Sequence, residues 1–271
     1  MELNTRDLAP RIGTELFADT GALLSGRHTA QIRYLLEKRG VLIFRGLNFT
    51  DEQQMAFSRT LGQIFQQGKD GLVKITLDET QSDVASYLHG TFFWHIDGAQ
   101  DELPTRASLL TARKLSPVGG QTQFANTYAA YEDLSGAEKL SLEGVRILHS
   151  QVRLQTLAKP DITQKELDYW RSISLKSHPL VWTHRSGRKS LVLGMTATAV
   201  EGLAEAEGLA LIDRLQEWSV QPQFVYQHEW ALGDLLIWDN TGCMHRVVPY
   251  PKDSGRMMHR TTLIGEEPVV A

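Results

Sequence analysis

Four short apolar segments follow one another near the end of the chain, and they constrain the fold more than any other feature of the sequence. They cover residues 224–229, 234–238, 245–248 and 257–263. Each has the length and the β-branched or aromatic content of a strand, and turn residues separate it from the next. Short strands at such regular spacing are typical of a β-sandwich or a jelly-roll barrel. We therefore expect a core of this kind.

Helical segments flank the expected core. Residues 28–39 carry apolar side chains at helical spacing, and Gly40 is suited to end that helix. Thr50 and Gln53 match a capping box at the start of a second helix. Residues 205–220 have one apolar face and predict a third helix. The predicted fold class is therefore α+β, mainly β with flanking helices.

No repeat, low-complexity tract or linker divides the chain, so we expect one domain, residues 1–271. Residues 78–91 are polar and without a clear period, and a long loop beside a site is a lid candidate. Residues 149–177 are expected to be an insertion that covers the site. Further strands are expected at 41–44, 72–77, 92–97, 107–112, 121–126, 178–184 and 189–194, and helical patches at 127–134, 137–142 and 163–170.

Composition excludes several classes of protein. Hydrophobic residues make up 42% of the 271 residues and charged residues 22%, which is ordinary for a soluble globular protein. A formal net charge of -4 gives no reason to expect nucleic acid or an anionic membrane as a partner. The sequence shows no signal peptide, and no apolar run approaches the roughly 18 residues of a membrane span. With Cys243 as the single cysteine, no intrachain disulfide can form, and we expect a cytoplasmic protein.

A candidate metal site begins in the segment Trp94-His-Ile-Asp. If residues 92–97 form a strand, His95 and Asp97 point the same way, because side chains alternate between faces. A third ligand is available far downstream at His245. Two histidines and one carboxylate form the facial triad of non-haem Fe(II) oxygenases, which leaves positions open for a cosubstrate and oxygen. A lone His-x-Asp match is common by chance, so the prediction depends on the whole set.

Two arginines accompany the expected triad. Arg256 and Arg260 lie four residues apart in the last expected strand, so both side chains would face one side of it. A guanidinium group binds carboxylates through two parallel hydrogen bonds. The pair therefore suggests a carboxylate clamp beside the metal.

Two other functions remain open from these residues alone. A zinc hydrolase can use the same two histidines and aspartate, since three protein ligands and a water are also a zinc pattern. It leaves the arginine pair unexplained. A non-catalytic jelly-roll binding module leaves the triad itself unexplained, because binding alone needs no open-sided metal site. Turnover of 2-oxoglutarate would separate both from an oxygenase.

The motifs together resemble the TauD/TfdA family of Fe(II)/2-oxoglutarate dioxygenases over essentially the whole chain. The second half, with Val200-Glu-Gly-Leu and Phe224-Val-Tyr-Gln-His, is more similar to the aryloxyalkanoate (2,4-D-type) branch than to the taurine branch. The segments that carry the family resemblance include Gly40-Val-Leu-Ile-Phe-Arg-Gly, Trp94-His-Ile-Asp, Pro117-Val-Gly-Gly-Gln-Thr, Gly233-Asp-Leu-Leu-Ile-Trp-Asp-Asn and Arg256-Met-Met-His-Arg-Thr-Thr.

The resemblance implies a double-stranded β-helix and a role for each motif. The iron ligands would be His95, Asp97 and His245. Arg256, helped by the Thr122 hydroxyl, would bind the distal carboxylate of 2-oxoglutarate, which is decarboxylated to succinate. Arg260 would lie near the iron-chelating end and contact either the cosubstrate or an anionic substrate. Related halogenases lack the carboxylate ligand, so the presence of Asp97 favours hydroxylation.

The expected substrate is a small, carboxylated organic molecule. If it is an aryloxyalkanoate, hydroxylation next to oxygen would cleave the ether. The alternative is a taurine-like sulfonate or a sulfate ester, with the same chemistry. Lys74, Thr91, Phe93 and Arg260 are the residues expected to contact it. The resemblance also implies a homodimer or homotetramer.

Overall fold

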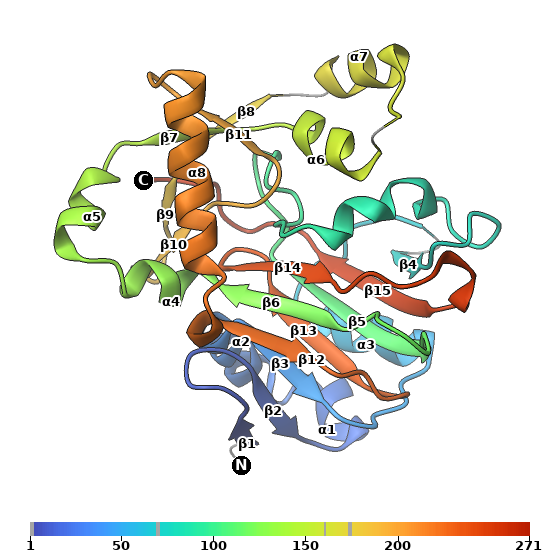
Figure 1. Ribbon diagram of the computed structural model, residues 1–271. Coiled ribbons are helices and arrows are strands. Elements are labelled where there is room, and N and C mark those ends of the chain that lie inside the picture. Colours follow the sequence, from blue (N-terminus) through green and yellow to red (C-terminus); the bar gives the residue numbers. More distant parts are fainter. Residues whose placement is uncertain (1–2, 69–70, 160, 173–174) are drawn as a thin grey trace.

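A seven-stranded mixed sheet forms the centre of the computed structural model, which describes residues 3–68, 71–159, 161–172 and 175–271 (Figure 1). Its strand order is β1-β2-β3-β13-β5-β15-β4, so strands from both ends of the chain lie side by side. β2 and β3 run parallel, and the other neighbours run antiparallel. In that order the strands span Asn4–Asp7, Thr14–Phe17, Val41–Phe44, Leu235–Asp239, Ala107–Lys114, Met257–Leu263 and Leu72–Ile75.

A smaller antiparallel sheet packs against one face of the large sheet. Its order is β12-β6-β14, and the ring of Phe124 in β6 lies 5.7 Å from that of Trp238 in β13, centroid to centroid. Both rings belong to one apolar cluster with residues of both sheets. The expected jelly-roll core is therefore confirmed. The small sheet consists of Val225–His228, Thr122–Asn126 and Cys243–Val247.

Alternation along β13 explains how one strand serves two apolar layers. Leu236 and Trp238 face the small sheet, whereas Leu235 and Ile237 face the helices on the other side. Those helices are α2 (Thr29–Arg39) and α3 (Asp51–Leu61), which cover the outer face of the large sheet (Figure 1). Because both faces are buried, the strand is apolar at successive positions.

Helix α8 (Glu205–Ser219) packs on β11 and on α4, and one of its ends lies beside the small sheet (Figure 1). Ala125 and Met244 of the small sheet belong to one apolar cluster with Ile212 and Leu215 of the helix. A second small sheet, β11-β7-β8, and the hairpin β9-β10 extend this side of the molecule. These strands span Ala197–Val200, Arg146–His149, Lys176–Pro179, Val181–Thr183 and Lys189–Leu191. The remaining helices and 3-10 turns are α1 Thr20–Leu24, α4 Thr127–Glu132, α5 Gly136–Ser141, α6 Gln151–Ala158, α7 Gln164–Ser172, η1 Ala85–Phe92, η2 Pro222–Phe224 and η3 Lys252–Ser254.

The predicted helices are confirmed closely. Helix α2 ends at Gly40, whose φ is 73°. Both hydrogen bonds of the capping box between Thr50 and Gln53 are present at the start of α3. Helix α8 covers the segment predicted from residues 205–220. Within the described ranges, no helix combines the length and apolar character needed to cross a bilayer.

The structure corrects the sequence prediction around the metal motif. Residues 92–97 are not a strand: only His95 pairs, as an isolated bridge. The expected loop 78–91 ends in the 3-10 helix η1. The insertion 149–177 contains α6, α7 and the first half of β8, while residues 160, 173 and 174 lie outside the described residues. Helix α6 packs directly on η1, so the insertion and the lid candidate form one surface.

Gly40 offers a test of how closely β3 packs on β14. Its φ is +73°, and a Cβ added there would overlap the Sγ of Cys243. Gly46, just beyond the other end of β3, has φ +60° and nothing within 4 Å of an added Cβ. We expect Gly46→Ala to lower the free energy of unfolding by about 1–2 kcal/mol through backbone strain. Gly40→Ala should cost roughly 2 kcal/mol more, because the sulfur must move.

Urea denaturation of the two variants measures this difference. Adding Cys243→Ala should shrink the cost of Gly40→Ala to that of Gly46→Ala, since the clash is removed and the strain stays. Equal costs for the two single variants would contradict the packing argument.

Candidate metal and cosubstrate site

Two histidines that are far apart in the sequence meet through their backbones. The N–H of His95 donates to the carbonyl of His245 at 3.1 Å, and the N–H of His245 donates back at 2.9 Å. His245 lies in the middle of β14, paired with Phe124, whereas His95 follows η1. Side chains of an antiparallel pair lie on one side of the ladder, and the two imidazole centroids are 4.1 Å apart. Main-chain hydrogen bonds therefore set the distance between the two rings.

Asp97 joins the histidines from a turn. Its Oδ1 lies 3.7 Å from His95 Nε2, and its Oδ2 lies 3.8 Å from His245 Nε2. The possible ligand atoms of the three side chains all lie within 4.8 Å of one another. The Thr105 hydroxyl donates to the Asp97 carbonyl at 3.0 Å and holds the turn. The structure thus brings the three predicted residues together without the predicted strand.

A backbone contact fixes the tautomer of His95. Its Nδ1 lies 2.8 Å from the carbonyl oxygen of Phe93. A carbonyl can only accept, so Nδ1 carries the proton and Nε2 keeps its lone pair. That lone pair is on the nitrogen nearest Asp97. A ring oriented in this way fits a metal cation, because ligating histidines commonly donate their other N–H to a carbonyl or carboxylate.

The charges of the cluster favour an ionised Asp97 and a neutral His245. Burial opposes ionisation of Asp97, but the Arg260 charge and the two histidines outweigh it and hold its pKa at about 2. Burial, and then the proximity of His95, lower the pKa of His245 to about 3. Because His245 is neutral at pH 7, Arg260 is the charge that keeps Asp97 ionised there. These protonation states are the ones that bind metal.

Both predicted arginines have N–H groups that are unused among the described residues, and Arg260 contacts the cluster directly. Arg256 is 2% exposed and lies just before β15. Its Nη2 donates to the Gly120 carbonyl at 3.1 Å, its guanidinium stacks on Tyr250, and its buried Nη1 has no partner. Arg260 donates from Nη1 to Asp97 Oδ2 at 3.4 Å, while its Nε has no partner. The buried Arg256 with its spare donor fits a carboxylate ligand, because an unpaired buried charge is costly, and half-buried Arg260 keeps one spare donor beside Asp97.

The hydroxyl of Thr122 is available as a hydrogen-bond donor because of Trp230, a residue that the sequence analysis did not identify. The indole Nε1 of Trp230 donates to Thr122 Oγ1 at 3.0 Å. An indole N–H can only donate, so the hydroxyl accepts there and can donate elsewhere. Trp230 follows β12 without any motif of its own, and only the strand pairing brings it to the start of β6. Trp230 therefore prepares Thr122 to donate to an acceptor such as a carboxylate.

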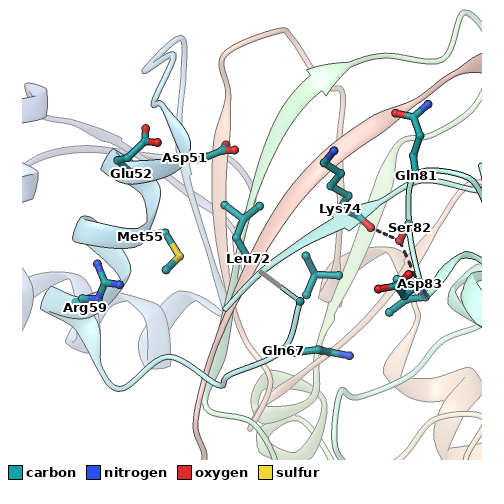
Figure 2. A pocket seen from close by; sticks show the side chains of 13 residues that line it. Asp51, Glu52, Met55, Arg59, Gln67, Leu72, Lys74, Gln81, Ser82 and Asp83 are labelled. Atoms are coloured by element: carbon teal, nitrogen blue, oxygen red, sulfur yellow. Dashed lines mark hydrogen bonds between the residues drawn. The ribbon is translucent and has the colours of Figure 1, made fainter. Parts of the chain in front are cut away.

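The other predicted substrate residues, Lys74, Thr91 and Phe93, have no side-chain contact with the triad among the interactions of the described residues. Lys74 pairs with His259 across β4 and β15, so its exposed side chain lies on the opposite face from Arg260. There it borders a cavity of about 970 Å³ between α3 and β4, away from the triad (Figure 2). Thr91 uses its hydroxyl within η1, donating to the Leu88 carbonyl at 2.6 Å. Phe93 is half-buried and contributes the carbonyl that orients His95.

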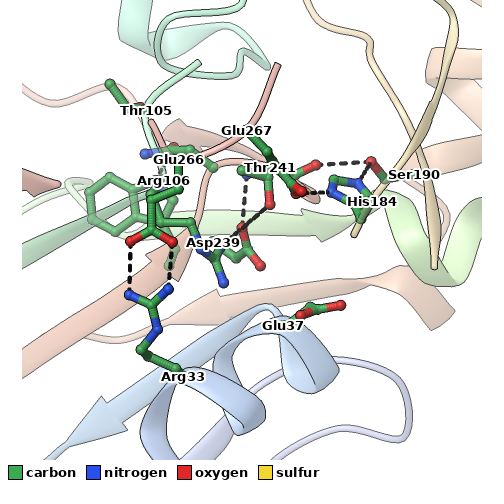
Figure 3. Close-up of polar contacts among 12 residues, drawn as sticks. Arg33, Glu37, Thr105, Arg106, His184, Ser190, Asp239, Thr241, Glu266 and Glu267 are labelled. Atoms are coloured by element: carbon green, nitrogen blue, oxygen red, sulfur yellow. Dashed lines mark hydrogen bonds and ion pairs between the residues drawn. The ribbon is translucent and has the colours of Figure 1, made fainter. Parts of the chain in front are cut away.

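A buried polar network supports the turn that leads to His245 (Figure 3). Arg106 Nη1 donates to Asp239 Oδ1 at 2.7 Å, and the backbone N–H and hydroxyl of Thr241 donate to the same oxygen. Asp239 therefore holds the turn before His245 in shape. Arg106 carries no signal in the sequence, because its partner lies 133 residues away. Burial and the Asp239 carboxylate act in opposite directions on the pKa of Arg106, and the carboxylate prevails, so the pKa is raised.

The sequence profile described as "Taurine catabolism dioxygenase TauD, TfdA family" matches residues 4–262. The chain belongs to the TauD/TfdA dioxygenase family. It is 31% identical to the alpha-ketoglutarate-dependent 2,4-dichlorophenoxyacetate dioxygenase of Burkholderia sp. (strain RASC), over 98% of this chain and 95% of that relative. It is 30% identical to the alpha-ketoglutarate-dependent sulfate ester dioxygenase of Pseudomonas putida, over 99% and 92%. The crystal structure of AAD-2 in complex with Mn(II) and N-oxalylglycine superimposes with a TM-score of 0.85 at 33% identity, covering all of both chains.

Membership of the TauD/TfdA family makes this protein an Fe(II)- and 2-oxoglutarate-dependent dioxygenase and an oxidoreductase. When bound, iron, 2-oxoglutarate and O2 supply the oxidant, and 2-oxoglutarate leaves as succinate and CO2. The zinc hydrolase and the non-catalytic binding module are thereby set aside. The resemblance to the aryloxyalkanoate branch is confirmed by the 2,4-dichlorophenoxyacetate dioxygenase.

The low pKa of His245 predicts that the metal-free protein loses stability in acid. The pKa is about 3 in the folded state and 6.5 in the unfolded state, so the unfolded chain binds the proton first as the pH falls. The free energy of unfolding should be full above pH 6.5 and fall towards pH 3, with a contribution from this group of at most about 1.4 kcal/mol per pH unit. Denaturation in chelator across this range should give a shallower slope for His245→Gln. Identical slopes would contradict the assignment.

Proposed function

We propose that this dioxygenase hydroxylates a small carboxylated molecule, with an aryloxyalkanoate as the favoured class, at an Fe(II) ion held by His95, Asp97 and His245. The observation that carries the proposal is this triad together with two arginines that have spare N–H donors: half-buried Arg260, which contacts Asp97, and buried Arg256. A triad alone accounts for the metal. The arginines account for the carboxylates of an acidic cosubstrate and an acidic substrate.

We assign the distal carboxylate of 2-oxoglutarate to Arg256 and Thr122. Arg256 is held in place by the Gly120 carbonyl and the Tyr250 ring, and its Nη1 is left to bind an acceptor. The Thr122 hydroxyl, with its proton freed by Trp230, supplies a second donor. A preorganised guanidinium loses little entropy on binding a carboxylate, which favours this assignment over a flexible lysine.

We assign Arg260 to the side of the site where the substrate enters. It contacts Asp97, so it lies nearer the metal than Arg256 does, and its Nε is available to a substrate carboxylate. Thr91 and Phe93 lie in or directly after η1, and we propose that this segment, residues 78–91 and the insertion 149–177 together cover the substrate. The contact of α6 with η1 supports this role, since Leu154 lies close to Gly90. Lys74 is left out of the proposed substrate site because it lies on the other strand face.

An aryloxyalkanoate would be cleaved by this chemistry. Hydroxylation of the carbon between the ether oxygen and the carboxylate gives a hemiacetal, which breaks its C–O bond to release a phenol and a keto acid. A sulfate ester is the second candidate, favoured by the similarity to the Pseudomonas putida enzyme. Hydroxylation next to its ester oxygen would release sulfate and an aldehyde. The products therefore separate the two substrates directly.

The metal assignment predicts a visible charge-transfer band when the apoprotein is titrated anaerobically with Fe(II) and 2-oxoglutarate. Asp97→Ala should abolish this band, because it removes one of three protein ligands. Asp101→Ala removes a carboxylate from the same turn and should keep it. Absence of the band in the wild type, or its survival in Asp97→Ala, would refute the proposed site. Succinate release then ranks phenoxyacetates against alkyl sulfates.

The cosubstrate assignment predicts that Arg256→Met raises the KM for 2-oxoglutarate at least about thirtyfold, since a buried charge pair loses about 2 kcal/mol or more when one partner is removed. Arg188→Met is the matched control. Arg188 also stacks on an aromatic ring, 4.3 Å from the centroid of Tyr128, but it pairs with Glu132, and neither residue borders the pocket of Arg256. The KM of the Arg188→Met variant for 2-oxoglutarate should be unchanged. An equal effect in both variants would show a general loss of packing instead.

The same proposal covers the setting of the enzyme. We infer a single catalytic domain in the cytoplasm, where Fe(II) and the lone Cys243 stay reduced. We also infer a homodimer or homotetramer, which sedimentation at several concentrations would distinguish from a monomer.

A further inference from the structure

We infer that Ser108 and Asn240 are positioning residues which fix the oxygen that Asp97 presents to the metal. The inference rests on the proposed function, in which Asp97 is an iron ligand. Asn240 belongs to the turn before β14, and Ser108 lies near the start of β5. Ser108 lies 11 residues after Asp97, and Asn240 comes from the other half of the chain.

Three hydrogen bonds connect Trp238 to Asp97 in one direction. The indole Nε1 of Trp238 lies 2.7 Å from Asn240 Oδ1, the Asn240 Nδ2 lies 3.1 Å from Ser108 Oγ, and Ser108 Oγ lies 3.4 Å from Asp97 Oδ2. An indole can only donate, so the Asn240 oxygen must face it and the amide NH2 must face Ser108. Ser108 then accepts from Asn240 and keeps its own proton for Asp97. The Trp238 indole, which can only donate, therefore determines the orientation of the Asn240 amide and of the Ser108 hydroxyl.

We call this series of hydrogen bonds, from Trp238 through Asn240 and Ser108 to Asp97, the relay. Its residues Trp238, Asn240 and Ser108 are shielded from solvent. Ser108 and Asn240 have no exposed surface, and Trp238 is 2% exposed. Without bulk water to offer alternative partners, a buried donor that loses its acceptor pays most of its desolvation cost. The hydroxyl of Thr262, 3.5 Å from Ser108, is the other partner within reach, and it makes a longer contact than Asn240 does.

The two oxygens of Asp97 are thereby made different. Oδ2 receives the Ser108 hydroxyl and the Arg260 guanidinium, both at 3.4 Å. Among the described residues, Oδ1 receives no hydrogen bond, and it is the oxygen nearest His95 Nε2. Oδ1 is therefore the oxygen free to bind a cation, and Asp97 offers the metal one oxygen instead of two. A one-oxygen ligand leaves room for the cosubstrate and O2.

Mn(II) binding to the purified protein tests the relay without any turnover. Free Mn(II) is followed by electron paramagnetic resonance during titration of the full-length apoprotein. Ser108→Ala should weaken Mn(II) binding about 10- to 100-fold, the range typical for a lost contact to a metal ligand. Ser108→Thr keeps the hydroxyl and should bind within about threefold of the wild type. Thr111→Val removes a buried hydroxyl from the other face of β5, where it faces Gln54, and should leave Mn(II) affinity unchanged.

Asn240→Asp gives the sharpest test, because the relay and simple electrostatics predict opposite results. The substitution keeps an acceptor for Trp238 but replaces the donor facing Ser108 with an acceptor. The Ser108 proton then turns away from Asp97, and Mn(II) binding should weaken. A negative charge added near a cation site would by itself strengthen binding.

The outcomes separate the relay from the site on which it rests. If the wild type fails to bind Mn(II), or if Asp97→Ala binds it normally, the proposed site fails and the relay with it. If the wild type binds Mn(II) and Asp97→Ala does not, the proposed site holds. The relay is then supported if Ser108→Ala and Asn240→Asp bind Mn(II) more weakly and Ser108→Thr binds it nearly as well as the wild type. Unchanged or tighter binding by Asn240→Asp overturns it, and this result decides the matter should Ser108→Ala not fold.

Discussion

The reciprocal backbone hydrogen bonds between His95 and His245 are the interaction on which the rest of the site depends. They tie the irregular segment after η1 to β14, whose other edge is held by β6. Main-chain bonds place both imidazoles without relying on side-chain packing. Once His95 is held, the turn that follows carries Asp97 into reach of both rings. The large sheet then adds Arg260 and Ser108 from strands β15 and β5, so each layer of the core contributes to one cluster.

The direction of the hydrogen bonds determines which atoms of this site can accept or donate, just as the distances determine which atoms meet. Groups that can only donate or only accept stand at the ends of three chains. The Phe93 carbonyl fixes the tautomer of His95, and the indoles of Trp230 and Trp238 fix the hydroxyls of Thr122 and Ser108. In each case a group that can only donate or only accept leaves its neighbour, which can do both, with one remaining role. Such constraints cost nothing when a ligand arrives, because the dipoles already point correctly.

The sequence predicted the parts of the structure that depend on local patterns. The apolar spacing and caps of α2, α3 and α8 are read from neighbouring residues, and so is the apolar character of β13. The triad was predictable because its residue types are rare in combination. Contacts across long separations carry no local signal, which is why Trp230 and Arg106 were missed. Lys74 was predicted to contact the substrate, but it lies one position along β4 from the residue paired with Arg260. In a strand, a shift of one position places a side chain on the opposite face.

Three residues outside the triad have the geometry of a catalytic site, but their burial excludes that role. Glu267, His184 and Ser190 lie in line, with 2.9 Å and 2.8 Å between their polar atoms, as in a serine hydrolase (Figure 3). A nucleophile must be reached by its substrate, yet Ser190 has no exposed surface and its hydroxyl donates to the Thr241 carbonyl. The chain of bonds instead runs from the C-terminal segment to the turn before His245. The same three residue types that cleave esters on other proteins therefore stabilise the structure here, and they do not compete with the cluster of His95, Asp97 and His245 as the candidate site.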